Sequence, residues 1–481
     1  MRAITNPADD RIEASYQLVF VCLIAAAVFL SAIGPVAMLA IAVGLPPAAM
    51  LVMGRTHLDR LVIVLLINLL FWLAYAIICG AVTLQELVNP AFYAGKGRIF
   101  LTYIPFVTLM ALSVRHATLR AIDMIFRIFA AVTLLAVAAN ATGVLPDVLL
   151  RREGVVLLMS SHHSAGYFFA YVALYFIARI LPAGLGASHW DMLLAGTGLL
   201  GLLSTNSRTA LLGVVLALAL YYAGRILVPR VIFAACALAV VAVTAGPPVL
   251  QATNPRLAAK IAAISDPRTM VAANTAVRFV IEADDPVPFS EELENRQFNN
   301  ITVRLYLWTI ALKKFVQSPI LGMGMMRWTD QRHSTTYSEI PGVLRILTDS
   351  GEREIGVGNA HNTYLMFLAQ TGLVGLALIL TFWIGLVMRL RRIATQAKTY
   401  GDFDIQKLAI AGQLMVFFVF GAGFTAHSFA APSIGFLPLM VAGALLSALR
   451  AEGSQKRAEN LAAYQSDATN SIKARADLSQ V

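Results

Sequence analysis

Long apolar stretches follow one another along almost the whole chain, and this pattern constrains the fold more than any other feature. Several approach the length of about 20 residues that a helix needs to cross the hydrocarbon core of a membrane. We identify twelve candidate spans, at 17–34, 36–53, 61–79, 100–114, 122–141, 164–181, 192–203, 209–226, 231–249, 362–388, 405–425 and 433–449.

The composition excludes a soluble protein. The 481 residues are 58% hydrophobic and 13% charged, and the mean hydropathy is +0.72. A soluble domain is typically about 45–50% apolar and about 25% charged. One soluble core cannot bury this excess, so a water-soluble enzyme, a disordered chain and a fibrous protein are all disfavoured. We therefore predict an all-α integral membrane protein with about 12 transmembrane helices that contacts the lipid bilayer.

The basic residues orient these spans. The net charge is +10, which in a soluble protein would suggest nucleic-acid binding. Here the basic residues lie mostly in short segments between apolar stretches, so they indicate topology and no nucleic-acid partner is expected. Four basic segments fall on one side of the membrane, at 55–60, 115–120, 225–230 and 389–398. The positive-inside rule places both chain ends in the cytoplasm.

This orientation divides the chain into five parts. They are a cytoplasmic N-terminus at 1–16, nine spans within 17–249, a large outer loop at 250–358, three spans within 359–449 and a cytoplasmic tail at 450–481. A loop of about 110 residues is usually functional or disordered.

One part of the large loop has helical periodicity. Its apolar residues Leu305, Trp308, Leu312 and Phe315 share one helical face, and Arg304 lies elsewhere on the same helix. The pattern predicts an amphipathic helix on the membrane or over the bundle. Pro319 is expected to end this helix, before a flexible turn at Gly322 and Gly324.

Cationic and imidazole side chains gather on the predicted outer face. They come from four separate segments, and together they could bind a phosphate-bearing substrate. The candidates are Arg151, Arg152, His162, His163, Arg208, Arg304 and His361, with Asn362 beside the last. Each has a structural alternative, because a histidine at a helix start can cap the helix and an arginine there can reach the lipid headgroups.

A possible metal motif has a simpler explanation. Asp402-Phe403-Asp404 matches the D-x-D pattern by which many glycosyltransferases hold a divalent ion. The topology places it in the cytoplasm before a span, where helix capping explains it better. The sequence has no zinc-binding, P-loop or clustered cysteine and histidine motif. We therefore expect no metal site and no cofactor.

Three motifs then suggest a family. Ser207-Arg208-Thr209 opens a predicted span. Arg304 precedes Trp308, Ala311-Leu312, Pro319 and Leu321-Gly322-x-Gly324. Ala360-His361-Asn362-x-Tyr364-Leu365 precedes Gln370-Thr371-Gly372-Leu373. With these motifs in this order, the chain resembles the bacterial O-antigen ligase and O-antigen polymerase superfamily over about residues 190–390. It departs from the family pattern in a longer stretch between Leu250 and Arg304.

The resemblance implies a glycosyltransferase of the bacterial inner membrane whose active site faces the periplasm. Its donor would be a glycan linked to undecaprenyl pyrophosphate. Arg208 and Arg304 would bind the pyrophosphate, and His361 would act as general base on an acceptor sugar hydroxyl. Asn362 would orient this histidine or bind sugar. Such a displacement inverts the anomeric centre and needs no metal.

Two alternatives stay open. Within the family, a ligase uses lipid A-core as acceptor, whereas a polymerase uses another carrier-linked repeat unit. From a different class, the chain could transport lipid-linked glycans. Transporters usually carry ionisable residues near the bilayer midplane or internal repeats. This sequence has few such residues and no evident repeat, so it favours an enzyme.

Overall fold

The computed structural model describes a helical membrane protein with two short hairpins. The residues it describes are 7–30, 34–52, 59–87, 89, 97–112, 114, 116–142, 150–151, 154–155, 159, 161–183, 188–205, 207–223, 300–325, 343–348, 351–356, 360–426 and 428–452.

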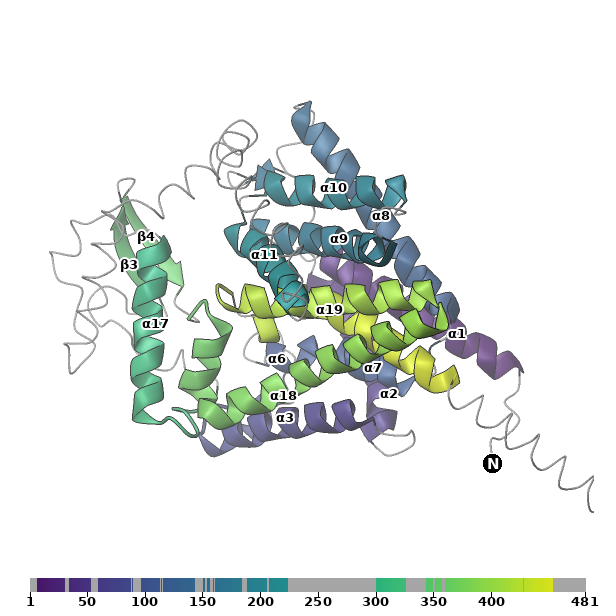
Figure 1. Cartoon of the computed structure of the whole chain (residues 1–481). Helices are drawn as coiled ribbons and strands as arrows, with labels where there is room; N and C mark the ends of the chain where they lie inside the picture. The colour runs from purple at the N-terminus through teal and green to yellow at the C-terminus, as the bar shows by residue number, and fades with distance from the viewer. Residues whose placement is uncertain are drawn as a thin grey trace, which may run out of the picture.

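Its helices are α1 (Pro7–Phe29), α2 (Gly34–Val52), α3 (Arg60–Ile78), α4 (Leu84–Leu87), α6 (Arg98–Thr102), α7 (Ile104–Ala111), α8 (His116–Ala141), α9 (His162–Ala183), α10 (His189–Ser204), α11 (Arg208–Ala223), α17 (Asn300–Gln317), α18 (Thr363–Tyr400) and α19 (Phe403–Gly423). A 3₁₀ turn, η4 (Ser428–Ala430), leads to the final helix, Pro432–Glu452. Figure 1 shows most of the long helices side by side as one bundle.

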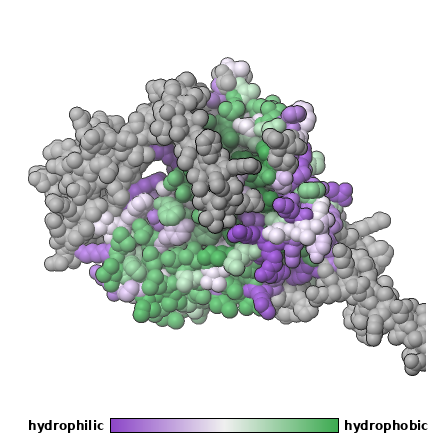
Figure 2. Space-filling model, in the orientation of Figure 1, coloured by the Kyte–Doolittle hydropathy of each residue, from purple (hydrophilic) through white to green (hydrophobic). Residues whose placement is uncertain are grey.

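Seven of the described helices are long and apolar enough to cross a membrane, and they fall into two groups. The spans of α9, α19 and the final helix are 78%, 83% and 83% buried, whereas those of α1, α3, α8 and α18 are 28–39% buried. The outer helices expose apolar side chains such as Ile67 and Leu70 of α3. Figure 2 shows an apolar band where Figure 1 places α3 and α18. A multi-pass membrane protein explains these exposed apolar faces.

The other predicted spans differ from simple membrane helices. The stretch 100–114 divides into α6 and α7 around Tyr103, and Pro105 near the start of α7 has no N–H to continue the first helix. Helices α10 and α11 have 16 residues each, fewer than a perpendicular crossing needs. Helix α2 contains Pro46 and Pro47. The predicted span 231–249 lies outside the described residues.

The connecting segments contain strands that the hydropathy pattern did not predict. Strand β3 (Val343–Thr348) pairs antiparallel with β4 (Gly351–Gly356), with Thr348 opposite Gly351. Strands β1 (Leu150–Arg151) and β2 (Gly154–Val155) form a second, smaller hairpin. The all-α prediction therefore describes the bundle but not these segments. Hairpins this short need no long apolar run, so a search for membrane spans misses them.

The bundle has two distinct ends. At one, α17 runs across the bundle beside the start of α18 (Figure 1); we call this the α17 end. At the opposite end, Arg389 lies 3.9 Å from Asp59, and His116 lies 2.6 Å from Glu452. The described residues of three predicted basic segments, at the starts of α3 and α8 and late in α18, therefore share one end, whereas the segment 225–230 lies outside the described residues.

Candidate active site

Helix α17 forms with the expected amphipathic character, but a different face points inward. Leu307 and Ala311 are completely buried, whereas Leu312 is 46% exposed. Arg304 precedes these two residues by three and seven positions, so it lies on the same inward face. The prediction that Arg304 lies off the apolar face is therefore wrong. Both prediction and structure agree on the helix itself, which ends at Gln317 before Pro319.

The turn after α17 is fixed to a kink in α18. Gly372 has φ 61° and interrupts the helical geometry of α18. Its neighbour Leu373 donates its N–H to Pro319 O at 2.9 Å, and Met323 donates its N–H to Ala369 O at 2.8 Å. A Cβ added at Gly372 would lie 2.2 Å from Ile320 O. The prediction of a flexible turn is wrong, because these backbone bonds hold it against α18.

His361 occupies a strained position just before α18. Its φ of 48° makes it the only non-glycine residue with positive φ among the described residues. Asn362 follows as the N-cap of α18: Oδ1 accepts from Leu365 N–H at 3.1 Å, and Nδ2 donates to Phe424 O at 3.2 Å. Thr363 continues the anchoring, since its hydroxyl donates to Ala426 O at 2.8 Å. These bonds hold the backbone around His361, and strain retained in this way often marks a functional site.

Helices α9 and α11 supply the remaining residues at this end of the bundle. Ser207 precedes α11, and its Oγ lies 3.3 Å from His163 Nδ1 on α9. The helices approach closely here, because a Cβ at Gly166 would meet Ser207 Cβ at 2.5 Å. Tyr167 lies one turn after His163, and the two rings stack with their centroids 6.5 Å apart. Arg208 is the first residue of α11 and is partly buried.

The charges of these residues act on one another. Burial lowers the pKa of Arg304, and the nearby positive charge of Arg208 lowers it further, while Tyr167 raises it. Burial also lowers the pKa of His361, with a further contribution from the charge of Arg304. Arg304 forms no ion pair with any carboxylate within the described residues. The group therefore combines like charges and a neutral imidazole in a partly buried setting that favours an anion.

The structure thus brings together His163, Arg208, Arg304 and His361 from three helices and the start of a fourth. Asn362 lies beside them, and its bonds favour the positioning alternative over direct contact with sugar. Arg151 is the last residue of β1, but its side chain and that of His162 lie outside the described atoms. Arg152 lies outside the described residues. Whether these three contribute stays a prediction.

Sequence reasoning did not assign two neighbours of this group to the site. Tyr167 is 6% exposed and lies four residues after His163, a spacing that places both on one helix face. Trp308 lies one turn after Arg304, and its indole Nε1 is buried without a hydrogen-bond partner. A buried donor without a partner is costly, so a bound polar ligand would stabilise it. The Arg-x-x-x-Trp spacing was the available signal.

The D-x-D segment caps a helix, as predicted. Asp402 Oδ1 accepts from Ile405 N–H at 3.1 Å at the start of α19. Asp404 lies 3.9 Å from Lys407 and is 93% exposed. Within the described part of the chain, no three histidine, cysteine, aspartate or glutamate side chains are arranged to hold a metal.

Comparison with known families identifies the region that carries this site. The O-antigen ligase family matches residues 193–380. That region of the chain is therefore similar to O-antigen ligases. It contains Arg208, Arg304 and His361, whereas His163 and Tyr167 lie before it. Among curated proteins, none matches the chain significantly. The resemblance to O-antigen ligases and polymerases is confirmed, and it supports a function of this general type.

Proposed function

We propose that the protein is a periplasmic-face glycosyltransferase of the bacterial inner membrane. It transfers a glycan from undecaprenyl pyrophosphate to a sugar hydroxyl of lipid A-core. The observation that supports this most strongly is the convergence of Arg304, Arg208 and His361 at the α17 end, within the O-antigen ligase region.

The two arginines bind the donor in this proposal. Arg304 and Arg208 repel each other in a partly buried site, and a pyrophosphate would neutralise both. A guanidinium donates two parallel hydrogen bonds to phosphate oxygens, which gives charge and orientation together. Charge that develops on the leaving pyrophosphate is stabilised by the same bonds.

His361 acts as the general base. The acceptor hydroxyl gives its proton to the imidazole while its oxygen bonds to the anomeric carbon. The bond from this carbon to the pyrophosphate oxygen breaks, and undecaprenyl pyrophosphate leaves with the electron pair. One direct displacement inverts the anomeric centre. The lowered pKa of His361 keeps the imidazole neutral and able to accept a proton at neutral pH.

Donor binding also strengthens the base. In the free protein, burial lowers the pKa of His361 and the charge of Arg304 lowers it further. A bound pyrophosphate offsets this charge, so the pKa of His361 rises towards the pH of the reaction. The imidazole therefore becomes a stronger base only once the donor is in place.

A reconstituted assay tests the proposal. The full-length protein in liposomes receives a glycan on undecaprenyl pyrophosphate together with lipid A-core, and the products are separated by mass. We expect a covalent glycan–lipid A-core product. Elongated glycan still attached to the carrier would instead identify a polymerase. Movement of the donor between leaflets without any covalent product would overturn the enzyme assignment.

A further inference from the structure

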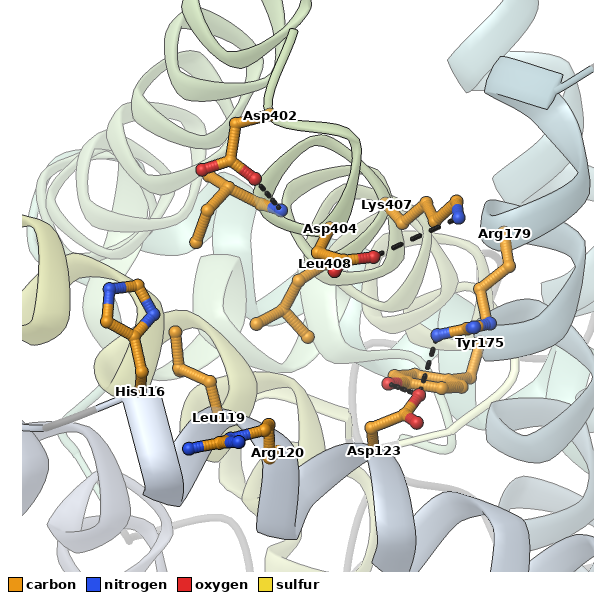
Figure 3. Close-up of a pocket in the computed structure, with 11 residues that line it drawn as sticks. His116, Leu119, Arg120, Asp123, Tyr175, Arg179, Asp402, Asp404, Lys407 and Leu408 are labelled. Carbon is orange, nitrogen blue, oxygen red and sulfur yellow. Dashed lines mark hydrogen bonds and ion pairs between the residues drawn. The ribbon is translucent and has the colours of Figure 1, made fainter.

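A polar pocket lies at the opposite end of the bundle from the candidate active site (Figure 3). Its volume is about 480 Å³. Three helices enclose it: the first two turns of α8, the first two turns of α19 and the end of α9. The titratable lining residues other than Tyr175 are His116, Arg120, Asp123, Arg179, Asp402, Asp404 and Lys407.

One wall of this pocket is a closed network. Arg179 donates to Asp123 Oδ1 at 2.7 Å and to Asp191 Oδ1 at 3.0 Å, and Tyr175 donates to Asp123 Oδ1 at 2.8 Å. These groups satisfy one another, so they offer a ligand little. Their effect is to hold α8, α9 and α10 together behind the pocket.

The other side carries charges that remain available. Arg120 has no hydrogen bond or ion pair within the described residues. Asp402 uses Oδ1 to cap α19, and its second carboxylate oxygen has no partner there. Figure 3 shows Asp402 and Arg120 on opposite sides of the pocket, with Leu408 between them.

The position of the pocket indicates a lipid. All three helices are candidate membrane spans, and the pocket lies at their ends. Two helical turns cover about 10 Å, which is enough to pass through the polar headgroup layer of one leaflet, about 5–8 Å deep. Apolar Leu119, Ile405 and Leu408 complete the lining. A ligand with a polar head and an apolar continuation fits this mixture.

The charge balance selects the kind of headgroup. Three arginine or lysine side chains and three aspartates line the pocket, so a ligand without net charge suits it best. We propose that the pocket binds the headgroup of a zwitterionic phospholipid, with its phosphate against Arg120 and its ammonium group against Asp402. The inference is independent of the proposed transferase function.

Lipid binding to the purified full-length protein tests this assignment. The probes are phosphatidylethanolamine, phosphatidylglycerol and soluble glycerophosphoethanolamine, added to the detergent-solubilised protein and followed by native mass spectrometry. We expect phosphatidylethanolamine to bind more tightly than phosphatidylglycerol. The soluble headgroup should bind far more weakly than either lipid, and equal binding of the soluble headgroup would overturn a lipid site.

Two substitutions test the two charged groups of the pocket one at a time. Arg120→Gln should weaken phosphatidylethanolamine binding about tenfold or more, since it removes a charge-assisted bond to phosphate. Asp402→Asn keeps a residue that caps helices well but removes the carboxylate, so the preference over phosphatidylglycerol should disappear. Arg391→Gln, an exposed arginine of α18 outside the pocket, is the matched control. Wild-type binding and selectivity in both pocket variants would refute the proposal.

Discussion

Buried arginines have opposite kinds of neighbours at the two ends of the bundle. At the end opposite α17, Arg179 is held by Asp123 and Asp191, at 2.7 and 3.0 Å. At the α17 end, Arg304 faces another arginine, Arg208, and the imidazole of His361. The same helix, α9, contributes to both ends through Arg179 and His163.

The presence or absence of carboxylate partners distinguishes an arginine that stabilises the fold from one that can bind a ligand. A buried cation whose carboxylates are supplied by the protein has its interactions complete, and removing one partner mainly destabilises the fold. Two cations close together are tolerated only at a cost, which an external anion relieves. Perturbed groups of this second kind concentrate at binding and catalytic sites. The α17 end is therefore the place to look for chemistry.

The largest effect should come from His361. His361→Ala should lower transfer per correctly inserted molecule by about 10²–10⁴-fold, the usual contribution of a general base. Donor affinity should change little, because the arginines remain. His189→Ala, at an exposed histidine that begins α10, is the matched control and should keep full turnover. Normal turnover with reduced membrane abundance in His361→Ala would indicate a purely structural histidine.

A matched pair of arginine substitutions sharpens the comparison between the ends. Arg304→Lys keeps the charge but loses the paired hydrogen bonds to phosphate. The kcat/KM for the donor should therefore fall about 10- to 100-fold. Arg179→Lys should lower the free energy of unfolding of the purified protein by about 1–2 kcal/mol. It should leave turnover per folded molecule unchanged. Equal losses of turnover in both variants would remove the distinction between the ends.

The pH dependence gives a smaller but more specific effect. Because the pKa of His361 is lowered, kcat/KM should stay high down to below pH about 6.5, the ordinary histidine value, and fall as the pH drops through the lowered pKa. Arg304→Gln should move this acid limb to higher pH, since it removes a charge that disfavours the imidazolium. Arg179→Gln should not move it. An acid limb that is the same in all three proteins would disconnect His361 from Arg304.

The smallest effect is expected from metal removal. Transfer should survive EDTA, because in the proposed mechanism Arg208 and Arg304 neutralise the leaving pyrophosphate. Substituting both Asp402 and Asp404 by asparagine should leave turnover within about twofold of wild type, a difference of less than about 0.5 kcal/mol. Restoration by Mg²⁺ or Mn²⁺ of activity lost in EDTA would contradict this mechanism.

Much of the architecture follows from the sequence. Apolar length and composition alone give a multi-pass helical membrane protein, since apolar runs of this length can cross the membrane as helices whose backbone hydrogen bonds are all internal. Asp402 was recognisable as a helix cap, and the motifs around Arg208, Arg304 and His361 indicated the family. Each of these inferences depends on residues close together in the sequence.

Tertiary contacts decided the remainder. Backbone hydrogen bonds between the turn after α17 and the kink at Gly372 fix the orientation of α17. They thereby decide that the face with Arg304 and Leu307 points inward. The contact of His163 with Ser207 and the positive φ of His361 likewise depend on packing between distant segments. Hydropathy records how each side chain partitions between water and an apolar medium. It carries no information about which face a neighbouring helix covers, so only the folded bundle determines where the charges meet.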